Sequence, residues 1–568
     1  MPPFLMKKTP KYDIIIYIHP AKFVYKIIHI KGVFVMHEHN NYNTFQTSFP
    51  LPNEKKFSDN EPVIKFYNLM GKIDLSAYLK SSSPKDYRGR KRLKRRNILL
   101  AILFAFSINV RSVREICTLF KYDTRFIFLL NGVEVSSHNT ICNIINEIKD
   151  VDKLLADINR GIFEIISIDR ETIYIDGTKI EAYANKYTFV WKNAVLKNKN
   201  KLLNKIKEII PPINIFFEEH KIPIIQIKDN YSYSELTPIL ESIGKILSTK
   251  VGELVHGKGK RKSIIQKLFE IFEEYTSKMG EYEKHLIIIG DNRNSYSKTD
   301  HDATFMRMKE DYMRNGQLKP AYNLQVGISN GYVMGLRLYQ DRTDFNTFIP
   351  FLNHIRDVYG KYPIYPVADA GYGNYENYKF CEKNKLELYL KYTTYSYEKT
   401  RRHTKNIYHK DNFKKDENNN ILCPQGYKFE YLRDKKEYKF EGAEISKVYI
   451  CKHCQNCQVR KNCTKSSIGR TIIINEEYEK LKKIAKENLD SDLGIKLRVN
   501  RSIQVEVFFA ILKEDSKYKK LYRRTIKKAE LEMTLIAIGQ NIRRYCEWDT
   551  IQYNIKNWEL FKILSFFI

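Results

Sequence analysis

The stretch "TIYIDGT" at residues 172–178 is a short, β-rich apolar run that leads into an aspartate and a glycine. A second stretch, "YPIYPVADAGYGN" at residues 362–374, has the same plan, with Asp369 in front of a turn bracketed by glycines. Because open α/β sheets place their chemistry at strand ends, Asp176 and Asp369 are candidate site residues. An aspartate before a glycine is more often simply part of a turn, so neither residue is decisive alone.

The segments around these two runs predict a mixed α/β sheet. "AYNLQVGIS" and "YVMGLRLYQ" flank an Asn-Gly pair, which predicts a β-hairpin. A helix is expected from a cap at Asp344 to Gly360, and a strand is expected over "LELYLKY". The lysine-rich stretch 192–285 is helical in pattern and predicts an insertion after the first aspartate. The fold class that follows is α/β, with a helical insertion.

The region before the first strand predicts helices and a phosphate contact. Residues 85–96, "KDYRGRKRLKRR", hold eight Lys or Arg against one Asp and run directly into an apolar helix. Arg92, Lys94, Arg95 and Arg96 are therefore candidate DNA contacts, although a solvated charge run has the same appearance. "SVREICTLFKYD" and "SSHNTICNIINEI" each open with a serine suited to a helix N-cap. These helices predict an all-α, helix-turn-helix-like DNA-binding domain over residues 85–160, and a purely structural bundle is the alternative.

The composition narrows the class of partner. The 568 residues contain 97 Lys and Arg against 66 Asp and Glu, a net charge of +31 that favours a polyanion such as DNA or RNA. The charge alone does not choose between nucleic acid and an anionic membrane. No run of about 18 uncharged apolar residues is present, so no segment is expected to span a bilayer, and DNA rather than a membrane is the expected partner. Nine cysteines without a signal peptide favour a reducing cytoplasm, where the protein would be associated with the nucleoid. Residues 1–84 are expected to be a poorly structured arm, of which 1–35 form an extension without function.

A third acid is suggested by "VEVFFAILKED" at residues 505–515. Glu506 and Lys513 lie two turns apart on one helix face beside an apolar stripe. The simpler alternative is an acidic first turn and a solvated lysine. A two-metal phosphodiester site needs hard oxygen ligands on rigid supports, and Asp176, Asp369 and Glu506 could supply them to two Mg²⁺ ions, or to Mn²⁺.

The cysteines cluster in "CKHCQNCQVRKNC" at residues 451–463. The spacing of Cys451, Cys454, Cys457 and Cys463 suits a tetrahedral structural Zn²⁺, with Cys423 as an alternative ligand. Cysteines without a metal, or an iron–sulfur or redox site, remain alternatives. The segment 396–475 is predicted to be a zinc-ribbon-like insertion.

Several long stretches resemble one family in order along the chain. They are "YIDGTKIEAYANKYTFVWK", "RNSYSKTDHDATFMRMKEDYMRNGQLKPAYNLQVG", "VADAGYGNYENY", "RSIQVEVFFAILKED" and "YRRTIKKAELEMTLIAIGQNIRR". Over roughly residues 90–548 the chain resembles bacterial insertion-sequence transposases of the DDE type, in the IS4/IS5-like group that carries a cysteine cluster. The resemblance implies a ribonuclease H-like catalytic core over 168–191 and 286–395. Residues 476–568 would be its C-terminal helical part with the third acid.

The resemblance also implies roles for individual residues. Asp176 and Asp369 would be the metal-binding aspartates, Glu506 the third acid, and Lys513 a contact to the DNA backbone. Related enzymes often have Tyr-x2-Arg-x3-Glu, but valine and serine occupy the first two positions here, and Arg501 stands one residue away as a candidate DNA contact. Trp191 could stack on an unpaired base, although a buried indole is the simpler explanation.

The expected function is that of a transposase. It would cleave DNA at the terminal inverted repeats of its element and join the freed end to target DNA. Because two ends must be brought together, a homodimer is expected. The alternatives are a sequence-specific DNA-binding protein whose catalysis has decayed, a hydrolytic nuclease without strand transfer, and an RNA-binding zinc-ribbon protein that would leave the acids without a task.

Overall fold

The computed structural model describes strand backbones between residues 8 and 35, and then residues 57–80, 94–135, 137–166, 168–249, 255, 261–308, 316–439, 442–515, 518 and 520–547. The chain divides into two compact units, Met1–Ile64 and Lys65–Ile568. In the first unit, four strands pair in the order β1 to β4, each antiparallel to the next. Their bounds are Lys8–Thr9, Tyr12–Ile18, Val24–Ile30 and Val33–Val35.

The segment before residue 80 is more regular than the expected arm. Helix α1 spans Pro62–Gly71, and a 3-10 helix follows at Leu75–Tyr78. Phe66, Leu69 and Met70 are fully buried. Their spacing is that of one helix face, a periodicity that the polar and turn-rich surroundings obscured.

The helices predicted before the strand that carries Asp176 are present. They are α2 (Arg95–Ser107), α3 (Val113–Tyr122), α4 (Thr124–Leu130), α5 (His138–Glu147) and α6 (Val151–Ile165). The side chains of Ser112 and Ser137 accept hydrogen bonds from the first turns of α3 and α5, as expected for N-caps. The helical composition of this region is therefore confirmed.

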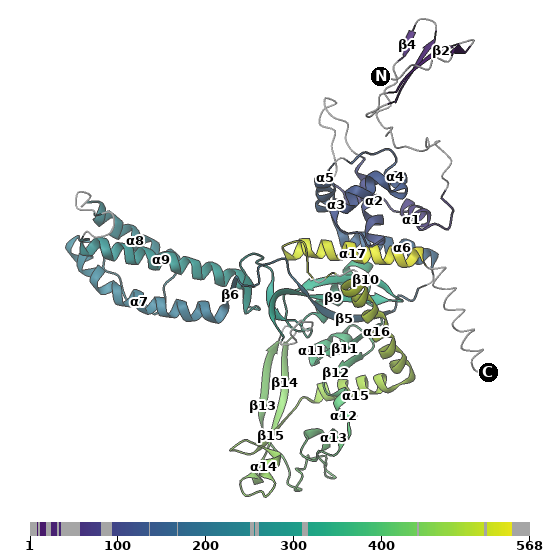
Figure 1. The fold of residues 1–568 in the computed structure, drawn as a ribbon. Coiled ribbons are helices and arrows are strands. Elements are labelled where there is room, and N and C mark those ends of the chain that lie inside the picture. The colour runs from purple at the N-terminus through teal and green to yellow at the C-terminus, as the bar shows by residue number, and fades with distance from the viewer. Residues whose placement is uncertain are drawn as a thin grey trace. The chain divides into compact units, whose positions relative to one another are not determined.

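A mixed sheet forms the centre of the second unit, in the strand order β10-β9-β5-β11-β12, with β8 paired to β9 (Figure 1). The bounds are Thr172–Glu181 for β5, Thr304–Arg307 for β8, Leu318–Ser329 for β9, Tyr332–Tyr339 for β10, Tyr365–Gly373 for β11 and Tyr389–Tyr392 for β12. β5, β11 and β12 are parallel, whereas β9 is antiparallel to β5, β8 and β10. Asn330 and Gly331 both have positive φ in the predicted hairpin turn. The predicted α/β class is confirmed.

Helices cover this sheet. They are α10 (Phe348–Tyr359), α11 (Tyr375–Lys383), α15 (Glu476–Asp490), α16 (Asp492–Ala510) and α17 (Ile526–Cys546). α16 packs against β5, β9 and β11, and α17 packs against β10 (Figure 1). α10 ends at Gly360, as predicted, but it begins at Phe348 rather than directly after Asp344. The carboxylate of Asp344 is engaged elsewhere, as described below.

The N-terminal helices are joined to the sheet through α17 and a buried pair of asparagines. α17 packs on α2 and α6 as well as on β10. Asn541 of α17 accepts a hydrogen bond from the Val333 backbone at 2.8 Å and donates to Asn159 of α6 at 2.7 Å. Both amides also donate to the Val333 carbonyl. The polar groups of three elements are thus satisfied in one buried network.

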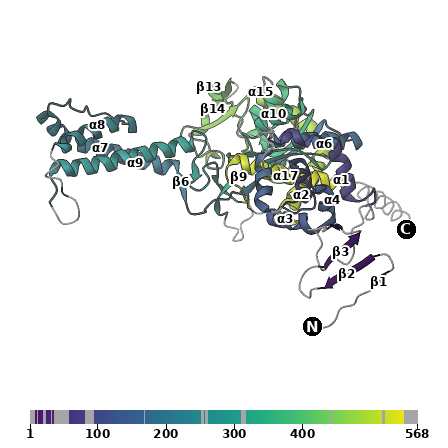
Figure 2. The same ribbon diagram turned by 90° about the horizontal axis from the view of Figure 1, so that it is seen from above.

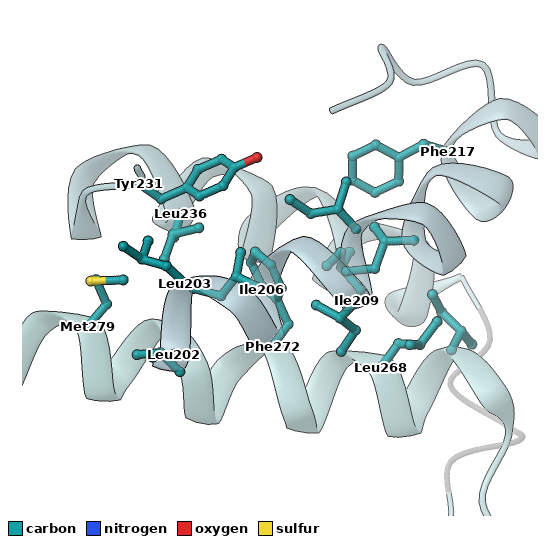
Figure 3. Close-up of a cluster of buried hydrophobic side chains, with 14 of the residues drawn as sticks. Leu202, Leu203, Ile206, Ile209, Phe217, Tyr231, Leu236, Leu268, Phe272 and Met279 are labelled. Atoms are coloured by element: carbon teal, nitrogen blue, oxygen red, sulfur yellow. The ribbon is translucent and has the colours of Figure 1, made fainter. Parts of the chain in front are cut away.

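The helical insertion forms a bundle with its own core. Strands β6 (Phe189–Trp191) and β7 (Ser295–Ser297) pair at its base, and α7 (Lys192–Glu219), α8 (Tyr233–Ser248) and α9 (Ile264–Ile289) lie side by side (Figure 2). Ile206, Leu236, Phe272 and neighbouring side chains meet between the helices (Figure 3). Apolar side chains from all three helices of the insertion therefore pack into one core.

The region with the clustered cysteines is built on a small antiparallel sheet. β13 (Glu430–Lys439), β14 (Gly442–Cys451) and β15 (Arg470–Ile474) pair in that order. Short helices lie before and between the strands: α12 (Tyr395–Glu398), α13 (Arg401–Thr404), a 3-10 helix at Lys410–Asn412, another at Lys452–Cys454, and α14 (Arg460–Cys463). Across the described residues, no helix is long and apolar enough to cross a bilayer.

Candidate active site

The two predicted aspartates lie on neighbouring parallel strands. Tyr365 of β11 pairs with Thr172 of β5, and the register continues to Val367 opposite Tyr174. Two residues beyond this last pair on each strand are Asp369 and Asp176. The two carboxylates therefore occupy equivalent positions at the point where β5 and β11 stop pairing.

The sequence predicted that these aspartates lie at the ends of strands. In the structure both strands continue past them, and what stops at the aspartates is the pairing between the strands. β5 continues to Glu181, paired with β9. β11 continues to Gly373, but its pairing with β12 is interrupted between Ala368 and Gly373. A break in pairing between strands leaves room for side chains and a ligand, as a strand end would.

Each aspartate is held by a nearby backbone N–H, and glycine is required beside it. Gly177 donates to Asp176 Oδ1 and Gly371 donates to Asp369 Oδ1, both at 2.8 Å. A Cβ at Gly177 would lie 2.2 Å from Gln325 Nε2, so any other residue here would force the buried Gln325 amide to move. The Asp-Gly signal of the sequence thus reflects close packing at the site rather than a turn.

Burial and the charge of Arg501 shift the pKa of Asp176 in opposite directions. Burial raises the pKa of its carboxyl group, the neighbouring charge of Asp369 raises it further, and Arg501 lowers it. Arg501 Nη1 donates to Asp176 Oδ2 at 2.9 Å. The site therefore holds a like-charge pair of carboxylates and already has one cation against it.

Asp344 is a third carboxylate at this place. Its Oδ1 accepts hydrogen bonds from Asn323 at 2.8 Å and from Gln325 at 2.9 Å. A Cβ at Gly371 would lie 3.1 Å from Asp369 Oδ1 and 3.4 Å from Asp344 Oδ2. Sequence analysis used Asp344 only as a helix cap, because an aspartate shortly before an amphipathic helix has the same pattern.

The pKa of Tyr372 is raised by all three of these acids. It is fully buried, and its hydroxyl donates to Gln325 Oε1. Burial raises its pKa well above the usual range, and the charges of Asp344, Asp176 and Asp369 all raise it further. Three negative groups therefore surround one phenol, which stays protonated and acts as a donor.

Glu506 and Lys513 lie further along the helix that carries Arg501. Arg501, Val505 and Phe508 form the buried face of α16, whereas Glu506 is exposed. Five helical residues turn the side chain by about 140° from Arg501. Among the described residues, Asp176, Asp369 and Glu506 do not have oxygens that all lie within 4.8 Å of one another. Lys513 lies in a π-helical turn, Ile511–Asp515, that continues α16.

Basic side chains lie near the acids. Burial lowers the pKa of Lys391 on β12, and the charges of Arg501 and Arg498 lower it further, whereas Asp369 raises it. These three cations therefore stand close enough to repel one another beside Asp369. Lys391 and Arg498 were missed by sequence analysis because nothing in their own segments marks them.

Of the other predicted DNA contacts, those that the structure describes lie on elements other than the ones that carry these acids. Arg92 lies outside the described residues. Lys94 is exposed at the start of α2, and Arg95 pairs with Glu147 at 2.7 Å; Arg96 is partly buried beside them. The Trp191 ring packs against Phe189 and Phe305, with ring centroids 5.8 and 5.9 Å away. Their roles with DNA stay predictions.

The five predicted cysteine ligands line one cavity. They are Cys423, Cys451, Cys454, Cys457 and Cys463, together with His453. The Tyr427 backbone donates to Cys423 Sγ at 3.3 Å, and the Arg470 backbone donates to Cys454 Sγ at 3.4 Å. Within the described part of the chain, no three of these sulfurs all lie within 4.8 Å of one another. The thiols are gathered, but not at the spacing of a closed metal site.

The mixed sheet and its carboxylate site define an α/β protein suited to cation-dependent chemistry. Residues 422–546 match the family model described as Transposase DDE domain, which supports a DDE-type transposase, as the sequence resemblance indicated. The matched region holds most of the cysteine cluster segment, Glu506 and Lys513. It begins after β5 and β11, so it does not include Asp176 or Asp369. Searches of curated proteins and of solved structures found no match. The transposase class implies DNA as the substrate.

Proposed function

We propose that this protein cleaves DNA at the terminal inverted repeats of its element and transfers the freed strand to target DNA, with Asp176, Asp369 and Glu506 as the acids of the site. The observation that carries the proposal is the register of β5 and β11, which brings Asp176 and Asp369 side by side. The acids lie 193 positions apart in the sequence, so their meeting is a property of the fold and not of a local motif.

We infer a ribonuclease H-like core from the strand order. Numbered along the chain within the sheet, and leaving out the short β8, the order is 3-2-1-4-5, with strand 2 antiparallel and strands 1, 4 and 5 parallel. Asp176 is on the first strand and Asp369 is on the fourth. This strand order makes the two strands neighbours in the sheet. The helix with Glu506 packs against the same two strands.

The residues present fit a divalent cation. Carboxylate oxygens are the ligands that Mg²⁺ prefers, and the field of the acids already attracts the guanidinium of Arg501. Asp176 and Asp369 would hold Mg²⁺ or Mn²⁺, with Asp344 as the nearest further carboxylate, and Glu506 would join them through a shift of α16. Bound Mg²⁺ supplies charge stabilisation at the reacting phosphate and activates the attacking group.

The chain's own residues prepare this site. Asn323 and Gln325 orient Asp344, and Gly177 and Gly371 orient the two aspartates. Lys391 and Arg498 stand where a DNA phosphate approaching Asp369 would meet positive charge. Because the carboxylates repel one another, cation binding would relieve a strain that the fold maintains.

We also propose that the cysteine lobe binds a structural Zn²⁺. The five thiols face one cavity, and backbone N–H groups already point at two of the sulfurs. Binding would draw four sulfurs together around the ion. Which four are used is open, since Cys423 lies on the segment before β13 and competes with the clustered thiols.

The proposed function is tested with purified protein, labelled DNA that carries the element's end, and Mg²⁺. Asp369→Ala and Glu506→Gln are expected to abolish discrete end cuts, because each removes an acid of the site. Asp357→Asn, an exposed carboxylate on α10, is the matched control and should cut normally.

The products separate the alternatives. Cuts followed by joining to a target plasmid support the transposase. Cuts without joining under any condition indicate a hydrolytic nuclease. Specific binding without cuts in Mg²⁺ or Mn²⁺ indicates the decayed DNA-binding protein. Unchanged cutting by Glu506→Gln alone would remove that residue from the site.

A further inference from the structure

Three potential metal ligands meet before the cysteine lobe, in a segment that the proposed function does not use. His403 Nε2 lies 3.1 Å from His409 Nδ1. Asp411 Oδ2 lies 3.8 Å from the first of these nitrogens and 3.5 Å from the second. Among the described residues this is the one set of three or more His, Cys, Asp or Glu side chains with ligand atoms all within 4.8 Å of one another.

The three distances match the edges of a metal coordination shell. Zn²⁺ binds imidazole nitrogen and carboxylate oxygen at about 2.0–2.2 Å in tetrahedral sites, so two of its ligand atoms lie about 3.4 Å apart. The three atoms of this cluster are therefore spaced as three corners of such a shell. Two imidazoles and one carboxylate are also a donor set that suits a divalent transition metal.

Hydrogen bonds alone leave one pair of these atoms in conflict. If His403 donates from Nε2 to His409, then His409 Nδ1 is an acceptor, as it is for the Asp411 backbone N–H at 3.5 Å. It then has no proton to offer the Asp411 carboxylate, and two acceptors face each other. If His409 donates instead, His403 Nε2 and the carboxylate face each other as acceptors. If both nitrogens carry protons, two donors meet at 3.1 Å. A cation at the centre satisfies all three atoms at once.

The fold holds the three side chains in place. His403 is 4% exposed, and the Tyr397 ring packs edge-on against it with centroids 5.0 Å apart. Asn412 Nδ2 donates to the His403 carbonyl at 2.7 Å and to the Asn406 carbonyl at 2.9 Å, which closes the loop between the ligands. Such outer contacts orient metal-binding imidazoles.

We propose that His403, His409 and Asp411 bind a divalent transition-metal ion, with Zn²⁺ as the best fit, at a site separate from the cysteine cavity. The site braces the connection between the sheet and the cysteine lobe. On one side, Tyr395 packs against Tyr392 of β12. On the other, Phe413 stacks on Phe429 of the lobe, with centroids 5.5 Å apart. The proposal does not depend on the transposase chemistry.

The experiment is a metal titration of the full-length protein after chelation, with Zn²⁺ and with Co²⁺ as a spectroscopic probe. His409→Ala and Asp411→Asn are each expected to bind one metal ion fewer per chain than the unmodified protein. His220→Ala is the matched control, because His220 is exposed and its Nδ1 bonds the Phe216 carbonyl of its own helix. Equal metal content in the unmodified protein and both site variants would overturn the proposal.

A second variant makes the result independent of folding defects in these mutants. Cys451→Ser with Cys454→Ser leaves three of the five thiols, too few for a four-sulfur site, so the intense sulfur-to-cobalt bands of that site should be lost or strongly weakened. The proposal expects this double variant still to bind one Co²⁺ per chain, with a weak spectrum typical of nitrogen and oxygen ligands. Loss of all Co²⁺ binding in a folded double variant would contradict a separate site.

Discussion

Arg501 Nη1 donates to Asp176 Oδ2 at 2.9 Å, across 325 positions of sequence. Both side chains are largely buried, at 11% and 22% exposure. Among the described residues, the buried Arg501 Nε has no hydrogen-bond partner, so the guanidinium is held chiefly by this one carboxylate. A positive group thus lies against an acid that we propose binds Mg²⁺, and the two cations compete for it.

Replacing Arg501 by Met is expected to strengthen the effect of Mg²⁺ on stability. Without the guanidinium, Asp176 is a buried charge next to Asp369, and loss of a buried partner costs about 3 kcal/mol of unfolding free energy. Mg²⁺ can offset that cost only by binding the acids. The rise in the thermal unfolding midpoint between chelator and excess Mg²⁺ should therefore be larger in Arg501→Met than in the unmodified protein.

Arg498→Met is the control for this comparison, because it removes a nearby cation that does not bond Asp176. Its Mg²⁺-dependent rise should stay close to that of the unmodified protein. If Arg501→Met shows the same or a smaller rise, the guanidinium and Mg²⁺ do not compete at Asp176.

Asp344→Asn is expected to slow end cleavage at least tenfold. The amide keeps the size and one acceptor oxygen for Asn323 and Gln325, but removes a negative charge from the site. Cleavage rates measured over a range of Mg²⁺ concentrations should show a higher concentration for half-maximal rate. A variant with the rate and Mg²⁺ dependence of the Asp357→Asn control would exclude Asp344 from the site.

Much of the fold could be predicted because its signals are local. The Asn-Gly turn between β9 and β10, the serine caps of α3 and α5, and the glycine after α10 each depend on a few adjacent residues. The same holds for the strand-like runs around Asp176 and Asp369. These features need no knowledge of distant parts of the chain.

The site could be predicted only in part because its partners are distant. Asp344 looked like a helix cap, and only the hairpin that brings Asn323 and Gln325 beside it reveals its place. Arg501 gave no sign that its partner is Asp176. His403, His409 and Asp411 lie within nine residues, but no regular helix or strand spacing marks them, since a loop closed by Asn412 brings them together.

Asn541→Ala is expected to destabilise the second unit by about 2–3 kcal/mol, because it leaves buried polar groups of α6 and β10 without a partner. Denaturant unfolding with constant slope would measure this loss. Gln540→Ala is the adjacent control, since the buried Gln540 Nε2 has no hydrogen-bond partner in the described part of the chain. Equal losses in the two variants would show that the asparagine network contributes no special stability.

Glu532 is expected to make stability fall as the pH rises through neutrality. Burial raises the pKa of Glu532 to about 7, from an ordinary value of 4.5, although the Tyr522 and Arg523 backbones donate to it. Between these values the folded protein keeps a proton that the unfolded chain has lost, so this residue's contribution is full below pH 4.5 and is lost as the pH passes about 7.

Glu532→Gln keeps an acceptor and cannot ionise. Its stability relative to the unmodified protein should therefore increase from pH 5 to pH 8 in denaturant unfolding. The exposed Glu115→Gln variant should show no such trend, and a flat difference for Glu532→Gln would mean that Glu532 ionises as readily in the folded protein as in the unfolded chain.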